Sequence, residues 1–579
     1  MAIQNLYPSI RPTLSLDFAN TKRLDSRITF TRSTGATYYD GKTVAKAEEN
    51  LLTYSQEFDN SYWLSNSLAN GSISTNTVET LAPDGTNTAD KFVGAATSSV
   101  KRFGKYWNNA PIIWSGTGTF SVFAKYGNSQ YFHAVCTKAE SGGYYGRIVG
   151  DLQNGTITDS SGVSDYGVQN VGNGWYRFWF TFNHSSAAFQ IELGLVPNSS
   201  GNAYDGNGRL TTGSETPANS NFYIWGAQLE QRSSVTAYTP TTSQPITNYI
   251  PVLQSAAANV ARFDHDPVTG ESKGLLIEEQ RSNLLTYSED FSNEAWIKQD
   301  STITANTVIA PDGTLTGDTV ALTADVISGI YNYAASAGTF TLSIFAKAKQ
   351  GQAGTKFRLI SYSSTDGGSE SSYFTLSESW QRFSWTRTVT AGTNWYVLNE
   401  SGGGAKEFYI WGAQLEAGAF PTSYIKTEAS QVTRAADVAS MTGTNFSSWY
   451  NALNGVFYYD FADGNVASHA GYAPYDTFIG AVTNGVRNGY MDSLCYIGGW
   501  TVRSKANPTF SGYLAPQSGT YVTTTIANFK VATFATRTAM GGVANGGSYV
   551  STAFTSAPSY PPNMLYINPA LNGHLRKIA

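Results

Sequence analysis

Cysteine is scarce in this sequence, and long apolar runs are absent. The 579 residues include only two cysteines, Cys136 and Cys495, which fall in different predicted domains, so we expect no structural disulfide and no zinc site. No run of about 18 apolar residues occurs, and Pro8 and Pro12 interrupt the N-terminal stretch that a signal peptide would need to be apolar. The sequence therefore predicts a protein that is made in the cytosol and is not inserted in a membrane.

Charged residues are also few. They make up 14% of the chain, the formal net charge is -5, and no run of Lys and Arg is longer than two residues. Nucleic acids and anionic membranes bind clusters of basic residues, so neither is expected as a partner. The composition is instead rich in glycine, with 56 residues, and in aromatic residues, which make up another 14%. This mixture favours short strands joined by turns rather than helices.

Motifs for catalysis and cofactor binding are missing as well. The chain has no P-loop, no dinucleotide-binding fingerprint and no Gly-x-Ser-x-Gly elbow, and no two of its five histidines stand at metal-ligand spacing. Glycoside hydrolysis generally needs two carboxyl groups about 5–10 Å apart, but no glutamate follows Glu428. A Ser/His/Asp site, whose members can lie anywhere along a chain, stays open. We expect no enzymatic activity, with a polysaccharide depolymerase as the alternative.

One long phrase occurs twice. "ENLLTYSQEFDNSYW" at Glu49 to Trp63 returns as "SNLLTYSEDFSNEAW" at Ser282 to Trp296. Four further pairs follow in the same order: "TVETLAPDGTNTADKF" and "TVIAPDGTLTGDTV", "GTFSVFAK" and "GTFTLSIFAK", "GWYRFWF" and "SWQRFSW", and two copies of "FYIWGAQLE". Five matches in one order indicate two copies of one domain, copy one and copy two.

The matched segments have the alternation that is typical of strands. In "GTFSVFAK", Phe120, Val122 and Ala124 alternate with side chains of the opposite face. A domain made of many such strands needs two sheets packed face to face, so we predict an antiparallel β-sandwich of jelly-roll type for both copies. From Ser448 onward, further strand-like segments match neither copy and predict a third all-β domain.

Three related segments flank the copies. They are "ITFTRSTGATYYDGK" at 28–42, "VARFDHDPVTGES" at 260–272 and "VTRAADVASMTG" at 432–443, and each has an apolar-x-Arg core followed by an acidic residue and a turn. We expect hairpins that seat each domain on the next in a semi-rigid rod. The predicted parts are an N-terminal attachment segment at 1–47, copy one at 48–244, a connecting hairpin at 245–280, copy two at 281–428 and the third domain at 429–579.

Several of these phrases resemble those of bacteriophage proteins. "RITFTRSTGATYYDG", "GLLIEEQRSNLLTYSEDF", "FYIWGAQLE", "PTSYI" and "VTRAADVASMTGTNFSSWYN" are similar to phrases of tail fibres and of other fibre-like or decorating proteins of the virion. The two copies resemble carbohydrate-binding-module jelly rolls, and the third domain resembles a laminin-G or concanavalin-like sandwich. The resemblance implies an all-β fold of two tandem jelly-roll β-sandwiches followed by a concanavalin/laminin-G-like β-sandwich.

The resemblance also implies a location and a function. The chain is expected in the virion, after synthesis in the host cytoplasm, as a homo-oligomer, by analogy a trimer, that contacts other virion proteins. Attachment to a host-surface glycan is the favoured function, because many weak sugar sites on one particle raise avidity by ~10²–10⁴. The alternative is a non-catalytic structural part of the virion, such as a head fibre, a capsid decoration or a tail adaptor.

The repeat divides the 13 tryptophans into two groups. Six occupy equivalent places in both copies and are predicted to belong to the cores: Trp63 and Trp296, Trp175 and Trp380, Trp225 and Trp411. The unmatched ones are candidates for contact, because sugar sites use flat aromatic faces, although a subunit interface explains exposed aromatics equally well. The predicted ligand-binding residues are Trp114, Trp179 and Trp395 in the copies, and Tyr475, Trp500 and Trp449 in the third domain. Phe178 and Trp179 are neighbours on a strand and cannot both point inward.

By resemblance only, jelly rolls of this kind often hold a structural calcium ion. Five carboxylates could supply oxygen ligands to such an ion: Glu48, Glu49, Asp90, Glu278 and Glu279. The alternative is that these residues form solvated acidic turns. No other cofactor is expected.

Overall fold

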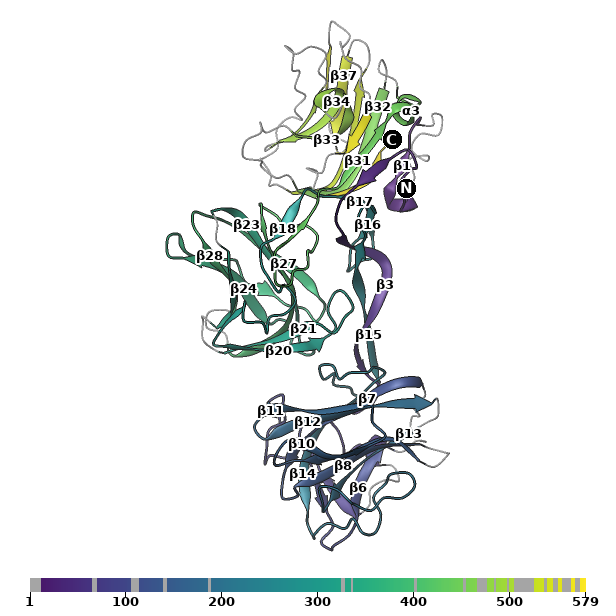
Figure 1. The fold of residues 1–579 in the computed structure, drawn as a ribbon, viewed down its shortest axis with the longest axis vertical. Helices are drawn as coiled ribbons and strands as arrows, with labels where there is room; N and C mark the ends of the chain where they lie inside the picture. The colour runs from purple at the N-terminus through teal and green to yellow at the C-terminus, as the bar shows by residue number, and fades with distance from the viewer. Residues whose placement is uncertain are drawn as a thin grey trace. The chain divides into compact units, whose positions relative to one another are not determined.

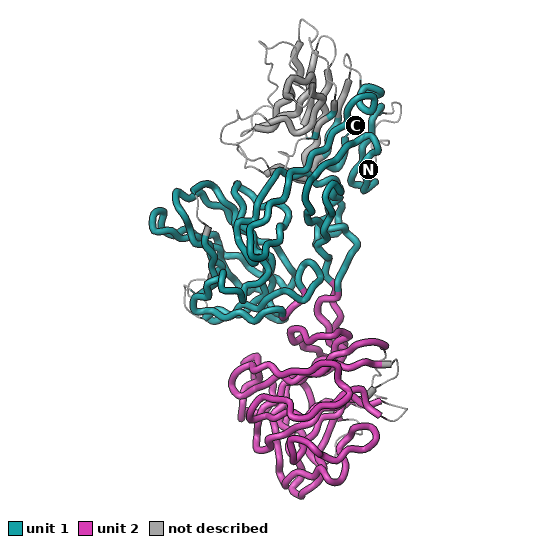
Figure 2. Tube along the Cα trace, in the orientation of Figure 1, with its two compact units in different colours: residues 1–45, 250–306, 310–579 teal, residues 46–249, 307–309 magenta. Residues whose placement is uncertain are grey.

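The computed structural model consists almost entirely of antiparallel strands, which confirms the predicted all-β class (Figure 1). It describes residues 12–64, 70–105, 114–138, 143–185, 189–323, 328–334, 337–399, 404–450, 455–465, 476–483, 486–496, 499–503, 525–535, 539–544, 550–553, 564–567 and 573–578. The chain divides into two compact units (Figure 2). Unit 1 comprises residues 1–45, 250–306 and 310–579, and unit 2 comprises residues 46–249 and 307–309.

Copy one is a two-sheet sandwich in unit 2. One sheet has the order β11-β12-β7-β14-β5-β4 and the other β10-β9-β8-β13-β6. The bounds are β4 (Gly71–Ser74), β5 (Asp90–Gly94), β6 (Lys101–Lys105), β7 (Ser115–Tyr126), β8 (Tyr131–Lys138), β9 (Tyr144–Asp151), β10 (Thr156–Ser161), β11 (Asp165–Gly172), β12 (Trp175–Ser185), β13 (Phe189–Val196) and β14 (Asn221–Glu230), with helix α2 (Ser61–Leu64) beside β6. The inner faces share one core, where the Phe132 and Phe178 ring centroids are 4.8 Å apart.

Copy two repeats this strand order within unit 1. Its sheets are β27-β23-β29-β21-β20 and β25-β24-β28-β22-β19, with β26 also paired to β24. The bounds are β19 (Ile297–Gln299), β20 (Ser301–Val308), β21 (Gly317–Leu322), β22 (Gly329–Ala334), β23 (Gly338–Ala348), β24 (Lys356–Ser363), β25 (Gly367–Glu370), β26 (Phe374–Thr375), β27 (Gln381–Val389), β28 (Thr393–Asn399) and β29 (Lys406–Ala417). The predicted strands at Phe120 and Phe340 are thus confirmed as parts of β7 and β23.

The repeated phrases have structural causes that are the same in both copies. The buried side chain of Asn283 donates to the carbonyl oxygens of Ala413 and Ile425 and accepts the N–H of Leu285 and Leu415, so that all its polar atoms are used. Asn50 does the same in copy one. In "FYIWGAQLE", the strand register shifts next to a glycine with positive φ in each copy, Gly226 (φ 57) and Gly412 (φ 61). A bulge of this kind favours glycine because L side chains are strained there.

Five of the six matched tryptophans are buried, as predicted. They are Trp63, Trp175, Trp225, Trp296 and Trp411. Trp63 and Trp296 lie between the sheets, whereas Trp225 and Trp411 pack in smaller clusters on the outer face of β14 and β29. The sixth, Trp380, is only half-buried and packs at the edge of the cluster that contains Trp411.

The third sandwich, also in unit 1, is assembled from three distant parts of the chain. Its sheets are β16-β17-β40-β32-β36-β37-β38, with β1 paired to β40, and β2-β31-β39-β33-β34-β35. The bounds are β1 (Leu16–Asp17), β2 (Thr29–Thr31), β16 (Arg262–His265), β17 (Ser272–Ile277), β31 (Val438–Thr442), β32 (Gly455–Asn465), β33 (Asp476–Thr483), β34 (Val486–Tyr496), β35 (Gly499–Arg503), β36 (Thr525–Ala535), β37 (Ala539–Ala544), β38 (Val550–Ala553), β39 (Met564–Ile567) and β40 (Gly573–Ile578), with helices α1 (Phe18–Thr21) and α3 (Gly443–Ser447).

The segments at 1–47 and 245–280, which were predicted to be an attachment segment and a connecting hairpin, therefore also contribute strands to the third sandwich. Leu16 is opposite Ile578 in the sheet, and Leu275 is opposite Leu575. Phe18 is buried in the same core as these residues. Burial of these apolar side chains makes the N-terminal segment and the 262–277 hairpin parts of the third sandwich.

The three flanking motifs meet in one buried ion cluster. It consists of Arg32, Arg262, Glu278, Arg434 and Asp437. The Asp437 carboxylate accepts hydrogen bonds from Arg32 at 2.9 Å and from Arg262 at 2.6 Å. Glu278 lies 2.8 Å from Arg262 and 3.5 Å from Arg434. The apolar-x-Arg pattern thus supplies the three guanidinium groups of this ion cluster, beside which β18 (Arg281–Asn283) pairs with β30 (Val432–Arg434).

Candidate functional site

Two predicted contact residues of copy one are partly accessible. Trp179 is half-buried on the outer face of its sheet, where its indole lies over Gly167, while Phe178 is buried in the core. The prediction that these neighbours face opposite sides is confirmed. Trp114 is half-buried and stacks on His184, with ring centroids 4.5 Å apart. A ligand-binding role for either residue stays a prediction.

Trp395 is not available for contact, and its prediction as a binding residue is wrong. Its side chain is 2% exposed and belongs to the core of copy two. In copy one, Ile191 on β13 is opposite Cys136 on β8. In copy two, Trp395 on β28 is opposite Ser361 on β24, the strand equivalent to β8, so Trp395 takes the place of Ile191. Copy two fills its core with a different distribution of volume, which cores tolerate when total volume and pattern are kept. An unmatched tryptophan can therefore still be a core residue.

The predicted residues of the third domain are only partly covered by the structure. Tyr475 lies outside the described residues. Trp500 lies on β35, opposite Cys495, but the structure does not describe its side chain. Trp449 is half-buried and packs against Phe446, with ring centroids 5.2 Å apart.

The predicted calcium ligands do not converge. Asp90 accepts the backbone N–H groups of Phe58 and Asn76, and Glu49 accepts that of Gln231. Glu48 accepts from the Asn248 amide, Glu279 pairs with Arg281, and Glu278 belongs to the ion cluster. Within the described ranges, no group of three His, Cys, Asp or Glu residues is placed to hold a metal ion. The same ranges contain no helix long and apolar enough to cross a membrane.

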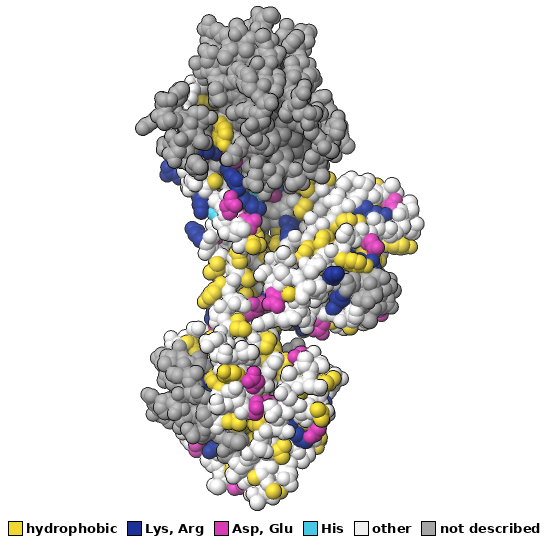
Figure 3. All heavy atoms as spheres, turned by 180° about the vertical axis from the view of Figure 1, so that it is seen from behind, with side chains coloured by type: hydrophobic (Ala, Val, Ile, Leu, Met, Phe, Trp, Pro, Cys, Tyr) yellow, Lys and Arg dark blue, Asp and Glu magenta, His cyan; other side chains and the backbone are white. Residues whose placement is uncertain are grey.

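Copy two carries an open aromatic surface whose residues were not predicted from the sequence. We call it the tyrosine face; it is the outer face of the sheet β25-β24-β28-β22-β19 and contains Tyr331, Tyr333, Tyr362 and Tyr396, with Tyr373 at its edge. Tyr333, Tyr362 and Tyr373 are 57%, 52% and 45% exposed. Tyr331 and Tyr396 are opposite each other on β22 and β28, with ring centroids 4.5 Å apart. Figure 3 shows one view of the described surface, where hydrophobic side chains lie among uncharged polar ones and scattered charged ones.

Polar groups accompany these rings. Asn394 lies between Tyr333 and Tyr362 in the register, since it is opposite each of them on the two neighbouring strands. Arg358, on the same face, pairs with Glu370 and lies 5.8 Å from the Tyr373 ring centroid. The face therefore combines flat apolar rings with an amide, a guanidinium and a carboxylate.

The equivalent face of copy one is covered by its own chain. Residues 197–220 connect β13 to β14, and Leu210 from this loop is buried against Val149 and Val196. The loop is fixed by a hydrogen bond from Arg102 to the Leu210 carbonyl oxygen at 2.5 Å, and the Tyr204 ring lies 5.2 Å from His133. In copy two only residues 400–405 connect the corresponding strands.

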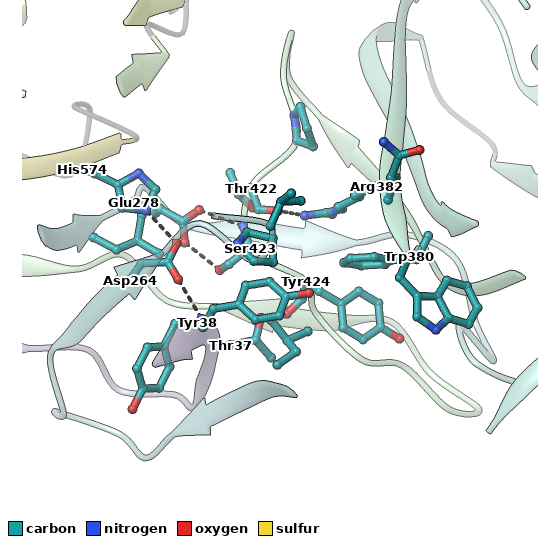
Figure 4. A pocket seen from close by; sticks show the side chains of 18 residues that line it. Thr37, Tyr38, Asp264, Glu278, Trp380, Arg382, Thr422, Ser423, Tyr424 and His574 are labelled. Atoms are coloured by element: carbon teal, nitrogen blue, oxygen red, sulfur yellow. Dashed lines mark hydrogen bonds and ion pairs between the residues drawn. The ribbon is translucent and has the colours of Figure 1, made fainter. Parts of the chain in front are cut away.

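A cavity of about 420 Å³ lies on the opposite sheet of copy two, within unit 1 (Figure 4). We call it the Trp380 cavity. Trp380 and Arg382 form one wall and Tyr38, Asp264 and His574 the other. Its further lining comes from β3 (Ala36–Asn50), β15 (Ile246–Ala256), and the segment after β29, which contributes Pro421, Thr422, Ser423 and Tyr424.

The charged groups of the cavity are held by protein partners. Asp264 accepts the Tyr39 N–H at 2.7 Å and lies 2.7 Å from Nε2 of His574. Glu278 accepts the N–H and hydroxyl of Ser423 and also pairs with the ion cluster. Burial alone would raise the pKa of Glu278, but Arg434 and Arg262 outweigh it and hold that pKa well below its usual range. Glu278 is therefore ionised at neutral pH.

The tyrosines could have been found by the comparison that was applied to tryptophan. By register, Tyr362 takes the place of Thr137 and Tyr396 that of Glu192, so both are unmatched aromatics. The loop between the strands is also visibly shorter in copy two. Nothing in the sequence signals the Trp380 cavity as a whole, because its walls come from segments up to several hundred residues apart.

By its described residues, the protein is an all-β protein with tandem antiparallel β-sandwiches, one of which has an open aromatic face. No family model and no curated protein matches the sequence. Among solved structures, the chain is similar to the N-terminal CBM22-1–CBM22-2 tandem domain of Paenibacillus barcinonensis Xyn10C, with 12% identity and a TM-score of 0.20, over 64% of this chain and 98% of that chain. It is also similar to the M60 catalytic domain with the CBM51-1 and CBM51-2 domains of Clostridium perfringens ZmpB, with 10% identity and a TM-score of 0.16, over 61% and 38% of the two chains. This likeness concerns the fold alone.

Proposed function

We propose that the chain binds a glycan through the tyrosine face, as an attachment part of a bacteriophage virion. One observation carries the proposal: copy two leaves open, and lines with exposed tyrosines, the sheet face that copy one covers with its own loop. A soluble protein rarely exposes several aromatic side chains on one face unless that face contacts a partner.

The chemistry of the face suits a sugar chain. The flat rings of Tyr333 and Tyr362 can pack against the C–H surface of pyranose rings, while Asn394, Arg358 and Glu370 offer donors and acceptors for hydroxyl groups. A sheet face is long and shallow, so it accepts an extended chain rather than an isolated small molecule. A single such site is weak, and many copies on one particle would raise the avidity by ~10²–10⁴.

The virion setting is supported by the phrases that resemble tail-fibre and decorating proteins. Attachment to a host surface, a location in the virion and contacts with other virion proteins are parts of the same proposal. Labelling phage particles with an antibody to this chain, followed by electron microscopy, tests the location. The proposal fails on this point when purified particles carry no label.

Glycan binding is tested with a double variant and a matched control. Tyr333→Ala combined with Tyr362→Ala should weaken binding to a host-polysaccharide or glycan array by roughly 5- to 150-fold, because exposed aromatic contacts contribute roughly 0.5–1.5 kcal/mol each. The control removes two exposed tyrosines of copy one, Tyr126 and Tyr166. Its binding should equal that of the parent chain. Equal loss in both double variants, or unchanged binding in the first, contradicts the proposed site.

A second candidate function is a purely structural role in the virion. The buried ion cluster favours it, because the cluster ties the N-terminal segment, the 262–278 region and residue 437 together, as a rigid mounting element requires. In that case the tyrosine face would pack against a neighbouring virion protein. Tight binding to tail or capsid particles without any glycan binding would favour this role.

We propose a non-catalytic protein in either case. A glycosidase needs one carboxyl group that is held protonated near neutral pH. Glu278, a carboxyl group of the Trp380 cavity, has its pKa lowered by Arg434 and Arg262 against the effect of burial and cannot act as that acid. Release of reducing ends from host polysaccharide would overturn this proposal.

A further inference from the structure

We infer that the Trp380 cavity is a second ligand site, which binds one neutral pyranose ring, free or at the end of a glycan. The inference rests on the proposed function in one respect, that the ligand class is a sugar. The site itself is separate, since the cavity and the tyrosine face lie on opposite sheets of copy two.

Comparison of the two copies shows how Trp380 differs from its counterpart Trp175. In copy one the equivalent Trp175 is buried, and its indole N–H donates to the Leu81 carbonyl oxygen at 2.8 Å. Lys125 donates to Thr80 in the same loop at 2.9 Å. Copy two has "TVIAPDG" where copy one has "TVETLAPDG", so Ile309 stands in the place of Leu81, and the two residues before Leu81 have no counterpart. Lys347 stands in the place of Lys125 and lies 5.8 Å from the Trp380 ring centroid, but Trp380 is only half-buried and lines the cavity.

The electrostatics of the lining select a neutral ligand. Asp264 and Glu278 each have close protein partners, as described above, and Arg382 donates to the Thr422 carbonyl oxygen and to the Ser343 hydroxyl. Asp264, Glu278 and Arg382 thus already have protein partners, and the lining carries charges of both signs. Because carboxylates and a guanidinium line the same cavity, its electric field favours neither sign, and a charged ligand would lose its hydration without a dedicated counter-ion.

The remaining features fit an amphipathic ring. The aromatic side chains of Trp380, Phe345 and Tyr38 provide apolar contact area. Nε of Arg382 has no hydrogen-bond partner among the described residues and can donate to a hydroxyl oxygen. A volume of about 420 Å³ lies within the usual range of small-molecule sites, roughly 300–1,000 Å³.

The test titrates the full chain with methyl glycosides of neutral hexoses and of N-acetylglucosamine, observed by saturation-transfer difference NMR. Binding is expected in the mM range, and Trp380→Ala should weaken it at least tenfold. A second variant fills the cavity without removing any core contact: Val268→Trp, at a lining residue that is 79% exposed. Its control is Val78→Trp, at a residue of copy one that is 90% exposed. Methyl glycosides of sialic acid and of glucosamine should not bind.

The outcomes separate this site from the tyrosine face. Loss of methyl glycoside binding in Val268→Trp, with binding kept in Val78→Trp and in the Tyr333/Tyr362 double variant, supports the inference. Unchanged binding in Val268→Trp overturns it, and so does the absence of methyl glycoside binding by the parent chain. In the latter case a glycan-array signal that depends on Tyr333 and Tyr362 leaves the proposed function intact.

Discussion

Replacing Asp437 by alanine should destabilise unit 1 strongly, because this carboxylate lies at the centre of the buried ion cluster. Its side chain is 0% exposed and accepts hydrogen bonds from Arg32, Arg262 and the backbone N–H of Glu278. Without it, three guanidinium groups, those of Arg32, Arg262 and Arg434, face the single carboxylate of Glu278. Removing one partner of a buried ion pair typically costs about 3–5 kcal/mol, since the other charge stays buried and unpaired.

Differential scanning calorimetry measures this effect. At roughly 2 °C per kcal/mol for a unit of this size, the transition of unit 1 should fall by about 6–10 °C in Asp437→Ala. Asp437→Asn keeps an acceptor for the Glu278 N–H, so the transition temperature of unit 1 should fall less in this variant. The control is Asp25→Ala, which removes a partly exposed pair with Arg27 at 2.8 Å and should cost below about 1 kcal/mol. Equal shifts in Asp437→Ala and Asp25→Ala would refute the reasoning.

Three further predictions follow from burial and charge. Phe18→Ala should destabilise unit 1 by about 3–5 kcal/mol in urea, with the unit 2 transition unchanged, because Phe18 belongs to the third sandwich. Trp395→Ala should cost a similar amount in the same assay, whereas exposed Tyr362→Ala should stay within about 0.5 kcal/mol. Burial raises the pKa of Asp90 to about 6, above the unfolded value near 3.9, so the native state holds a proton that the unfolded state has lost. The stability of unit 2 from this group should therefore fall by roughly 2–3 kcal/mol as the pH rises from about 4 to 6, and Asp90→Asn should flatten that part of the pH profile of thermal unfolding.

The sequence predicts the sandwiches of the two copies well because their signals are local and doubled. Strand alternation around Phe120 and the recurrence of "FYIWGAQLE" both depend on residues that are close in the chain. Each copy must bury the same inner face, so shared residues such as Trp63 and Trp296 are core residues. Duplication thus acts as an internal comparison for structural residues.

The composition of the third sandwich could not be predicted in this way. Leu16 pairs with Ile578 and Phe30 with Ala439, and such long-range pairing leaves no periodic or local trace in the sequence. The same holds for the ion cluster. The three apolar-x-Arg motifs were recognisable as related segments, but their likeness does not reveal that the arginines share the carboxylates of Asp437 and Glu278.

Both candidate sites occur where copy two is shorter than copy one. The connection at 400–405 replaces the covering loop at 197–220, and "TVIAPDG" beside the Trp380 cavity is two residues shorter than "TVETLAPDG". The inner faces of the sheets do not need the covering loop, so its loss opens an outer surface without disturbing the core, and that surface stays on rigid strands. Loop length between duplicated domains is therefore a better indicator of open surfaces in this chain than an unmatched aromatic residue alone, as the burial of Trp395 demonstrates. Grafting residues 197–220 in place of 400–405 would test this relation directly, since it should cover the tyrosine face and abolish its glycan binding while the Trp380 cavity keeps its ligand.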